Sequence, residues 1–251
     1  MHDLKDKVAV ITGGNAGIGL ATAREFVARG ARVIITGRRQ EALDRAVAEL
    51  GEQVTAIRSD ASRLTDIDAL AQQVKSQFGK VDVLVVNAGV ALQEPVGTMT
   101  EDTFDQLVDI NFKGAVFTTE KFIPLLVDGA SVIHLSSVSA YTVAQGTGIY
   151  AATKAALTAY SKTAAVELAD RRIRVNTVAP AMTETEMIYR GAFASEEIHT
   201  FIRSKMPFKR YGTPQEVAKL VAFLASDDAA FISGAEYTID GGASVNAPMR
   251  A

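Results

Sequence analysis

The sequence contains no cysteine and only three histidines among 251 residues. The absence of cysteine excludes disulfide bonds, thiolate metal sites and a cysteine nucleophile, and it is consistent with a cytoplasmic protein. The histidines, His2, His134 and His199, are scattered along the chain. We therefore expect no metal site, and His134, which lies in a predicted strand, is expected to be a hydrogen-bonded core residue.

The chain also lacks a strong excess of charge and any long apolar run. The net charge is −3 with no basic block, so we expect no binding to nucleic acid. No apolar stretch reaches the roughly 18 residues that a membrane span requires. Residues 1–7 are charged and lead directly into a predicted strand, without a signal-peptide pattern. Hydrophobic residues make up 48% of the chain, which is enough for the core of one α/β domain over residues 1–251.

A glycine-rich turn follows the first predicted strand. The apolar run at 7–12 predicts a buried parallel strand, and residues 20–29 predict a helix. Between them lie Gly13, Gly17 and Gly19, which suit a tight turn, a close backbone approach to a pyrophosphate, and close packing of helix on strand. Phosphates would then bind at the helix N-terminus. The alternative is a glycine-rich turn without a ligand.

The end of the second predicted strand indicates which cofactor is preferred. An NAD site usually has an acidic residue at this position, whereas here the strand 32–36 is followed by Gly37, Arg38 and Arg39. A guanidinium suits the 2′-phosphate of NADP through charge-assisted hydrogen bonds. The sequence therefore favours NADP over NAD. Alternatively, the arginines lie in solvent, which is the stronger possibility for Arg39.

Strands and helices alternate along the rest of the chain. We predict strands at 54–58, 81–86, 131–135, 174–178 and 236–239, and helices at 40–50, 66–78 with Thr65 as its cap, 100–127, 150–170 and 215–225. This order predicts a doubly wound, Rossmann-like parallel sheet of seven strands with helices on both faces. Polar or glycine clusters follow the first six strands, and ligands bind at that edge of such sheets. An acceptor such as Asp60 at this edge suits an adenine amino group or a helix cap.

Two segments have more than one interpretation. Asn111 lies near the apolar face of the predicted helix 100–127, where it either makes a buried hydrogen bond to backbone or holds a water in the site. Residues 183–211 combine helical pieces with many apolar side chains and are expected to form a lid over a substrate. The alternative for this segment is a dimer contact or a satellite core.

Tyr150 and Lys154 are four residues apart in an alanine-rich stretch that predicts a helix. They would therefore lie on the same helix face. The positive charge of the lysine is expected to lower the pKa of the phenol toward the working pH. Taken alone, most such pairs have no catalytic role, so the interpretation depends on the other motifs.

Together these motifs resemble the short-chain dehydrogenase/reductase family along nearly the whole chain. The matching residues are 12–19, Asp60-Ala61, Asn87-Ala88-Gly89, Asn111, Ser137, Tyr150 with Lys154, Asn176 with Pro180, and Gly241-Gly242. Ser137 rather than Ser136 carries the match, because it precedes Tyr150 by 13 positions (150 − 137). Two departures are Val86, where the family commonly has Asn, and Ala181, where it usually has Gly. The second departure bears on the backbone path beside the nicotinamide.

The resemblance implies a role for each matching residue. Tyr150 would exchange a proton with the substrate oxygen, Ser137 would hydrogen-bond that oxygen, Lys154 would bind the nicotinamide ribose, and Asn111 would hold a water. The cofactor-binding residues would be Gly13, Asn15, Gly17, Ile18, Gly19, Gly37, Arg38, Arg39, Asp60, Ala61, Asn87, Ala88, Gly89, Tyr150, Lys154, Pro180, Ala181, Thr183 and Thr185.

The implied activity is that of an NADP-dependent carbonyl reductase or alcohol dehydrogenase, with NAD as the other possible cofactor. A 3-oxoacyl-carrier-protein reductase is an alternative, which would favour a basic patch formed by Arg203, Lys205, Lys209 and Arg210. A non-catalytic cofactor-binding regulator is a further alternative. The resemblance also implies a homotetramer, or a homodimer, built partly through the last helix and strand.

Overall fold

The computed structural model describes residues 3–189 and 195–246. Seven strands form one sheet, and their bounds are β1 Val8–Ile11, β2 Arg32–Gly37, β3 Val54–Arg58, β4 Val81–Val86, β5 Leu126–Leu135, β6 Arg174–Pro180 and β7 Glu236–Ile239. The strand order is β3-β2-β1-β4-β5-β6-β7, and every neighbouring pair is parallel. The predicted doubly wound parallel sheet is therefore confirmed.

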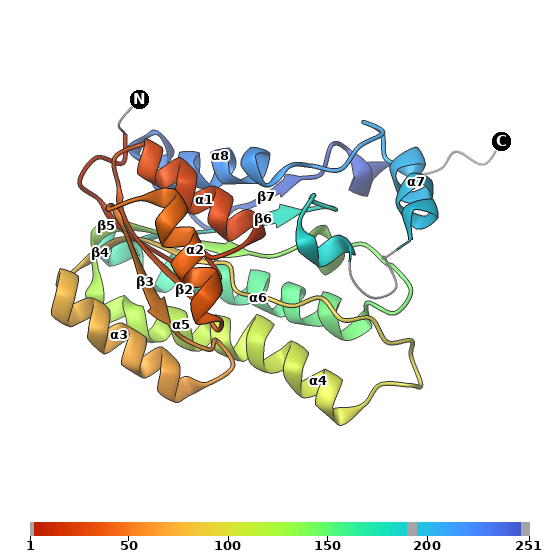
Figure 1. The fold of residues 1–251 in the computed structure, drawn as a ribbon, viewed down its shortest axis with the longest axis horizontal. Helices are drawn as coiled ribbons and strands as arrows, with labels where there is room; N and C mark the ends of the chain where they lie inside the picture. Colours follow the sequence, from red (N-terminus) through yellow and green to blue (C-terminus); the bar gives the residue numbers. More distant parts are fainter. Residues whose placement is uncertain (1–2, 190–194, 247–251) are drawn as a thin grey trace.

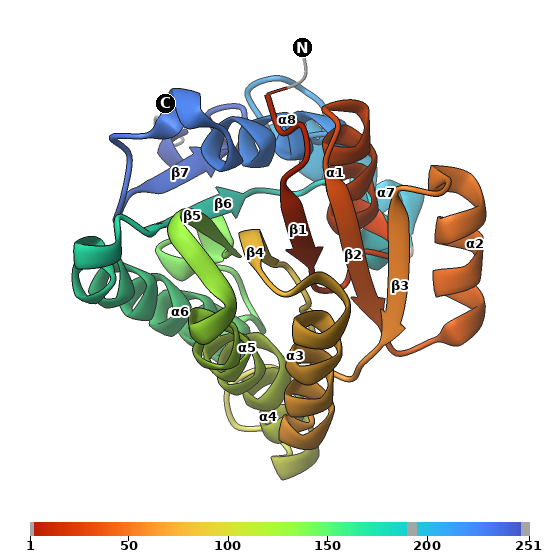
Figure 2. The ribbon, with the colours of Figure 1, turned by 90° about the vertical axis from the view of Figure 1, so that its left-hand side faces the viewer.

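Helices cover both faces of this sheet (Figures 1 and 2). Their bounds are α1 Gly17–Ala28, α2 Gln40–Leu50, α3 Leu64–Phe78, α4 Glu101–Val108, α5 Gly114–Phe122, α6 Gly148–Glu167, α7 Glu196–Lys205 and α8 Pro214–Ala225. One buried apolar cluster joins the sheet to Phe26 of α1 and Val221 of α8. The other joins it to Phe122 of α5 and Leu157 of α6. The sheet lies between these two helix layers. The carboxyl ends of its strands are left uncovered by helices, and the loops lie there.

The predicted helix over 100–127 is wrong in its middle and at its end. Five residues, Asp109–Lys113, form a π-helical turn between α4 and α5, and β5 already begins at Leu126. Gly114 follows the π turn, and a Cβ there would lie 2.0 Å from the carbonyl oxygen of Ala61. This close approach joins the π turn to the loop after β3. A wider turn is one way in which a helix adjusts its register, and such turns are frequent at functional sites.

Two further predictions need correction or qualification. Thr65 is not the cap of α3, because the helix begins at Leu64 and its N-cap is Arg63. The expected lid at 183–211 contains a short 3₁₀ turn at Glu186–Tyr189 and helix α7, whereas residues 190–194 lie outside the described residues. The base of this segment is a parallel bridge between Thr183 and Gly212.

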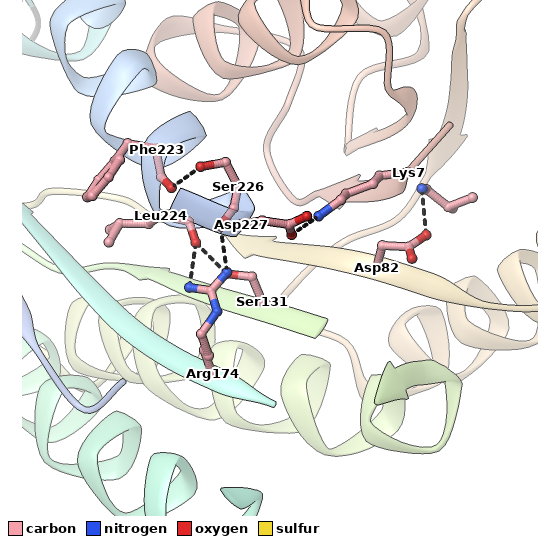
Figure 3. A network of polar contacts seen from close by, with 9 residues as sticks. Lys7, Asp82, Ser131, Arg174, Phe223, Leu224, Ser226 and Asp227 are labelled. Carbon is pink, nitrogen blue, oxygen red and sulfur yellow. Dashed lines mark hydrogen bonds and ion pairs between the residues drawn. The ribbon is translucent and has the colours of Figure 1, made fainter. Parts of the chain in front are cut away.

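The sheet is fixed to α8 at the end opposite the loops by Arg174, which is only 8% exposed (Figure 3). Its guanidinium donates hydrogen bonds to the carbonyl oxygens of Leu224 (2.8 Å) and Ser226 (3.1 Å), and Ser131 Oγ also donates to Leu224. These carbonyls lie at the carboxyl end of α8, where a positive charge is favourable. Burial lowers the pKa of Arg174, and the charge of Asp227 opposes that shift.

We predict that Arg174→Met lowers the free energy of unfolding by about 2–3 kcal/mol, because it removes the Arg174 donor to the Ser226 carbonyl oxygen and one of the two donors to the Leu224 carbonyl oxygen. The matched control is Lys7→Met. Lys7 is also shown in Figure 3, and its ion pair with Asp227 (2.7 Å) is largely exposed on the aspartate side. An exposed pair contributes at most about 1 kcal/mol. Denaturant unfolding of both variants measures the difference, and equal losses would contradict this account of Arg174.

Candidate active site

The ends of β1 and β4 are joined by hydrogen bonds from Asn87 and Thr12. Thr12 Oγ1 accepts hydrogen bonds from the backbone N–H of Asn87 (2.9 Å) and of Ala88 (3.0 Å). The Asn87 side-chain amide donates to the carbonyl oxygens of Thr12 (2.9 Å) and Gly13 (3.2 Å). A Cβ on Gly19 would lie 2.3 Å from the Gly13 oxygen, so α1 starts close beneath the turn only because residue 19 is glycine. The glycine turn is thus fixed to the end of β4.

A cleft of about 560 Å³ opens over this junction. Most of the predicted cofactor residues line it, namely Gly13, Asn15, Gly17, Ile18, Arg38, Arg39, Asn87, Ala88, Gly89, Tyr150, Lys154, Pro180 and Thr185. Gly13 (φ 64°) and Gly17 (φ 52°) have left-handed backbone conformations that favour glycine. A Cβ on Gly17 would lie 3.1 Å from the side chain of Thr185, so the segment after β6 lies directly against the glycine turn.

The other predicted site residues do not line the cleft. These are Gly19, Gly37, Asp60, Ala61, Asn111, Ser137, Ala181 and Thr183. Asp60 Oδ1 accepts hydrogen bonds from the N–H (3.0 Å) and hydroxyl (2.8 Å) of Ser62, so it stabilises its own turn and does not cap α3. Thr183 donates to the carbonyl oxygen of Ala181 (3.0 Å), and Ala181 N–H donates to Ile239 (3.2 Å). These groups support the cleft from behind.

Arg38 and Arg39 are both exposed and both line the cleft. Among residues 3–189 and 195–246, no carboxylate forms an ion pair with either guanidinium. Gly37 supports the neighbouring turn, since a Cβ there would lie 2.5 Å from Oδ1 of Asn15. The rim of the cleft after β2 therefore has two positive charges with no acidic partner, which is a suitable environment for an anion.

Tyr150 and Lys154 line the other end of the cleft, with Ser137 next to the phenol. Tyr150 lies in the first turn of α6 and is partly buried, and Ser137 lies near enough to its phenol to influence the pKa of that group. Lys154 is only 5% exposed; its Nζ donates to the Leu135 carbonyl oxygen at the end of β5 (2.8 Å). A Cβ on Gly89 would lie 3.5 Å from this Nζ, so glycine at position 89 leaves space beside the ammonium. Ser136, by contrast, bonds to the Lys154 carbonyl oxygen (3.2 Å) and lies near the Thr158 hydroxyl (3.1 Å).

The expected lowering of the tyrosine pKa is not found in this arrangement. Burial raises the pKa of Tyr150, and the hydrogen bond from Ser137 opposes that shift only in part. The Lys154 ammonium lies 5.9 Å from the centroid of the Tyr150 ring and is bonded to a carbonyl instead. Burial also lowers the pKa of Lys154 to about 8. In this protein the cost of removing both groups from water outweighs their mutual interaction.

Asn111 lies in the π turn and is 1% exposed. Its side-chain oxygen accepts from the N–H of Val90 (2.8 Å), and its side-chain nitrogen donates to the carbonyl oxygen of Val90 (2.9 Å). The simpler of the two predicted interpretations, a buried hydrogen bond to backbone, therefore describes these contacts. The residue fixes the chain just after Gly89, beside the lysine.

Several residues that line the cleft were not among the predicted ones. They are Ala16, Val90, Leu135, Ser136, Glu186 and Met187. Ala16 and Val90 adjoin predicted residues, so proximity in the sequence was an available signal. Glu186 and Met187 come after β6 in a 3₁₀ turn whose position depends on contact with the glycine turn. No local pattern in the sequence indicates that contact.

His134 and His199 are not among the residues that line the cleft, and His2 lies outside the described residues. His134 is fully buried, its ring nitrogens lie 2.9 Å from the Thr119 hydroxyl and 2.7 Å from the Ser161 hydroxyl, and burial lowers its pKa to about 3. Within the described part of the chain, no three residues of the types His, Cys, Asp or Glu are grouped so that they could hold a metal ion. None of the helices described there has the length and apolar character needed to cross a membrane.

Comparison with known proteins agrees with this architecture. Residues 13–244 match the family model described as enoyl-(acyl carrier protein) reductase. The chain is 36% identical to the NADP-dependent (R)-specific alcohol dehydrogenase of Lentilactobacillus kefiri, over 95% of this chain and 97% of that protein.

Two solved structures extend the comparison to the fold. A short-chain dehydrogenase/reductase from Serratia marcescens superposes with a TM-score of 0.91 at 32% identity, covering 97% of this chain and 100% of that one. A 3-ketoacyl-(acyl-carrier-protein) reductase from Brucella melitensis, complexed with NADH, gives 0.89 at 31% identity, covering 96% and 99%. With the strand order and the residues around the cleft, these matches lead to one conclusion: the chain belongs to the short-chain dehydrogenase/reductase family of NAD(P)-dependent oxidoreductases.

Proposed function

We propose that this protein is an NADP-dependent oxidoreductase that interconverts ketones and secondary alcohols. The observation that supports it most directly is the content of one cleft. A phenol near Ser137 and a buried lysine lie at one end, and at the other lie two arginines that pair with no acidic side chain of the described residues. The positive-φ glycines between them provide a backbone surface suited to a pyrophosphate.

In this proposal NADPH, when bound, supplies the hydride, and the side chains of the protein position the groups and transfer the proton. Tyr150 donates its phenolic proton to the carbonyl oxygen of the substrate, or accepts one from the alcohol in the reverse direction. Ser137 hydrogen-bonds the same oxygen and stabilises the negative charge that develops there. Lys154 binds ribose hydroxyls through Nζ, for which Gly89 leaves space. Asn111 positions the backbone of Val90 beside them.

The remaining proposed cofactor contacts follow from position. Gly13, Asn15, Gly17 and Ile18 approach the pyrophosphate, Asn87 to Gly89 approach a ribose, and Pro180 and Thr185 border the nicotinamide end.

Residues 183–211 act as a substrate lid in the single domain that we propose for residues 1–251. The family relationship supports a homotetramer or homodimer, and the small net charge of −3 without a basic block supports a cytoplasmic protein without nucleic-acid or membrane partners. β7 lies at an edge of the sheet, which leaves one side of that strand for a second copy.

A 3-oxoacyl-carrier-protein reductase is less well supported. That activity favours free basic side chains around the mouth of the site. The four predicted basic residues instead interact with neighbouring groups. Arg210 forms two bonds to Glu216 (2.7 and 2.9 Å), and Arg203 pairs with Glu196. Lys209 donates to the Ser204 carbonyl oxygen (2.7 Å), and Lys205 lies over the Phe201 ring. The regulator alternative leaves the combination of Ser137, Tyr150 and Lys154 without a purpose.

We predict that Tyr150→Phe lowers kcat for ketone reduction by about 10²–10⁴-fold, since it removes the proton donor and little else. The control is Tyr160→Phe on the same helix, whose hydroxyl bonds to Glu120 (2.7 Å), far from the cleft lining. Turnover on a panel of ketones with NADPH measures both variants. Equal turnover by Tyr150→Phe and the unmodified protein would refute the role of Tyr150 as proton donor, and no turnover by either would favour the regulator.

We predict that Arg38→Asp raises the KM for NADPH at least about tenfold while the KM for NADH changes little, because the carboxylate repels a 2′-phosphate and accepts a hydrogen bond from a 2′-hydroxyl. Steady-state kinetics with both cofactors provide the measurement. An unchanged ratio of the two KM values would mean that Arg38 does not select the cofactor.

We also predict different pH dependence in the two directions. Because burial raises the pKa of Tyr150, the phenol is protonated near neutral pH and is ready to donate in reduction. Oxidation needs the phenolate, so kcat/KM for an alcohol should rise about tenfold per pH unit below the pKa of Tyr150. The kcat/KM for reduction of a ketone should stay level up to about pH 8, where Lys154 loses its proton. Profiles of both directions from about pH 6 to about pH 9 test this. A flat oxidation profile would exclude Tyr150 as the base.

A further inference from the structure

A third arginine, Arg58, contacts the turn that carries Arg38 and Arg39 and is not itself among the residues that line the cleft. Arg58 is the last residue of β3, and in the parallel register of β2 and β3 its Cα is paired with that of Gly37. The residue is exposed, as Arg38 and Arg39 are. Position 58 is 20 residues from position 38 in the chain, so strand pairing brings Arg58 to the backbone of Arg38. The carboxyl ends of two neighbouring strands thus carry three guanidinium groups.

Arg58 also contacts the segment that carries Arg38. Its Nε donates a hydrogen bond to the carbonyl oxygen of Arg38 (3.1 Å), and the N–H of Ser59 donates to the carbonyl oxygen of Gly37 (3.1 Å). These two bonds fix the backbone of the β2–α2 turn from the side of β3. The bond through Nε uses one donor of the guanidinium and leaves both terminal amino groups of Arg58 without a partner among the described residues.

Some of the described arginines pair with a carboxylate, whereas Arg38, Arg39 and Arg58 do not. Arginines elsewhere that pair with a carboxylate are Arg24, Arg29, Arg63, Arg171, Arg203 and Arg210. In the part of the chain that the structure describes, no acidic side chain pairs with the guanidinium groups of Arg38, Arg39 or Arg58. Guanidinium groups without a carboxylate partner keep their donors available to a phosphate.

We propose that Arg58 is a further determinant of NADP specificity, which holds the Arg38 backbone through Nε and binds the 2′-phosphate through its terminal amino groups. The inference rests on the proposed NADP preference and extends it to a residue outside the glycine turn and the β2–α2 turn. Arg58 would thus position the backbone of Arg38 and also contact the 2′-phosphate directly. The 2′-phosphate is therefore bound from two strands rather than one.

The test measures the binding of cofactor fragments by calorimetry, without turnover. The probes are 2′,5′-ADP, which carries the 2′-phosphate, and 5′-AMP, which lacks it. For Arg58→Gln we expect the Kd of 2′,5′-ADP to rise about tenfold, as one charged phosphate contact is lost, and the Kd of 5′-AMP to change less than about twofold. Arg58→Lys keeps the charge but not the planar fork, so its Kd for 2′,5′-ADP should lie between those of Arg58→Gln and the unmodified protein.

The matched control is Arg45→Gln, which removes the same charge from an exposed position on α2; unlike Arg58, Arg45 forms no hydrogen bond with the Arg38 backbone in the described part of the chain. It should leave both Kd values unchanged, and thermal unfolding of each variant verifies the fold. If Arg58→Gln weakens both nucleotides equally, or neither, the inference about Arg58 is overturned. If the unmodified protein binds 2′,5′-ADP and 5′-AMP equally well, the NADP preference itself fails, which is a distinct result.

Discussion

The site depends on the hydrogen bonds that join the ends of β1 and β4. These strands are neighbours in the sheet, yet Thr12 and Asn87 are 75 residues apart in the chain. The helix after β1 packs on one face of the sheet, and the helices after β4 pack on the other, so neither covers the strand ends between them. A cleft at such a switch point is a general property of doubly wound sheets. Here the Thr12–Asn87 contacts fix the base of the cleft, because they set the distance between the glycine turn and the chain at Gly89.

The catalytic side chains are placed relative to that floor. Lys154 lies beside Gly89. Asn111 binds the backbone of Val90, the residue after Gly89, through its side-chain oxygen and its side-chain nitrogen. The π turn explains how Asn111 reaches this point. A regular helix through 100–122 would advance its side chains by about 100° per residue, whereas one wider turn displaces the residues after it. Gly114 then allows the same segment to contact the carbonyl oxygen of Ala61. One irregular turn thus joins the loops after β3 and β4.

The sequence allowed much of the fold to be predicted, because buried parallel strands are short apolar runs that end at glycine or polar residues. The predicted strands at 54–58, 81–86 and 236–239 have the observed bounds, and most of the predicted cofactor residues line one cleft. The failures share a cause. The π turn, the early start of β5 and the place of Glu186 and Met187 depend on contacts with distant segments, which no local pattern records. The contact of Arg58 with Arg38 was not predicted for the same reason, because it depends on the register between β2 and β3.

The electrostatics of Tyr150 and Lys154 show why spacing along a helix does not determine a pKa. Four residues of separation place the two groups on one face, but the ammonium bonds to Leu135, and burial becomes the dominant effect on both. A buried amine with a pKa of about 8 is close to losing its charge near neutral pH. Any group that fills the cleft and accepts hydrogen bonds from Nζ favours the charged form of the lysine, and that charge in turn favours the phenolate. The acidity of Tyr150 is therefore linked to occupancy of the cleft: the protonated phenol that reduction needs is present without the nucleotide, and the phenolate that oxidation needs is favoured when the nucleotide half of the site is filled.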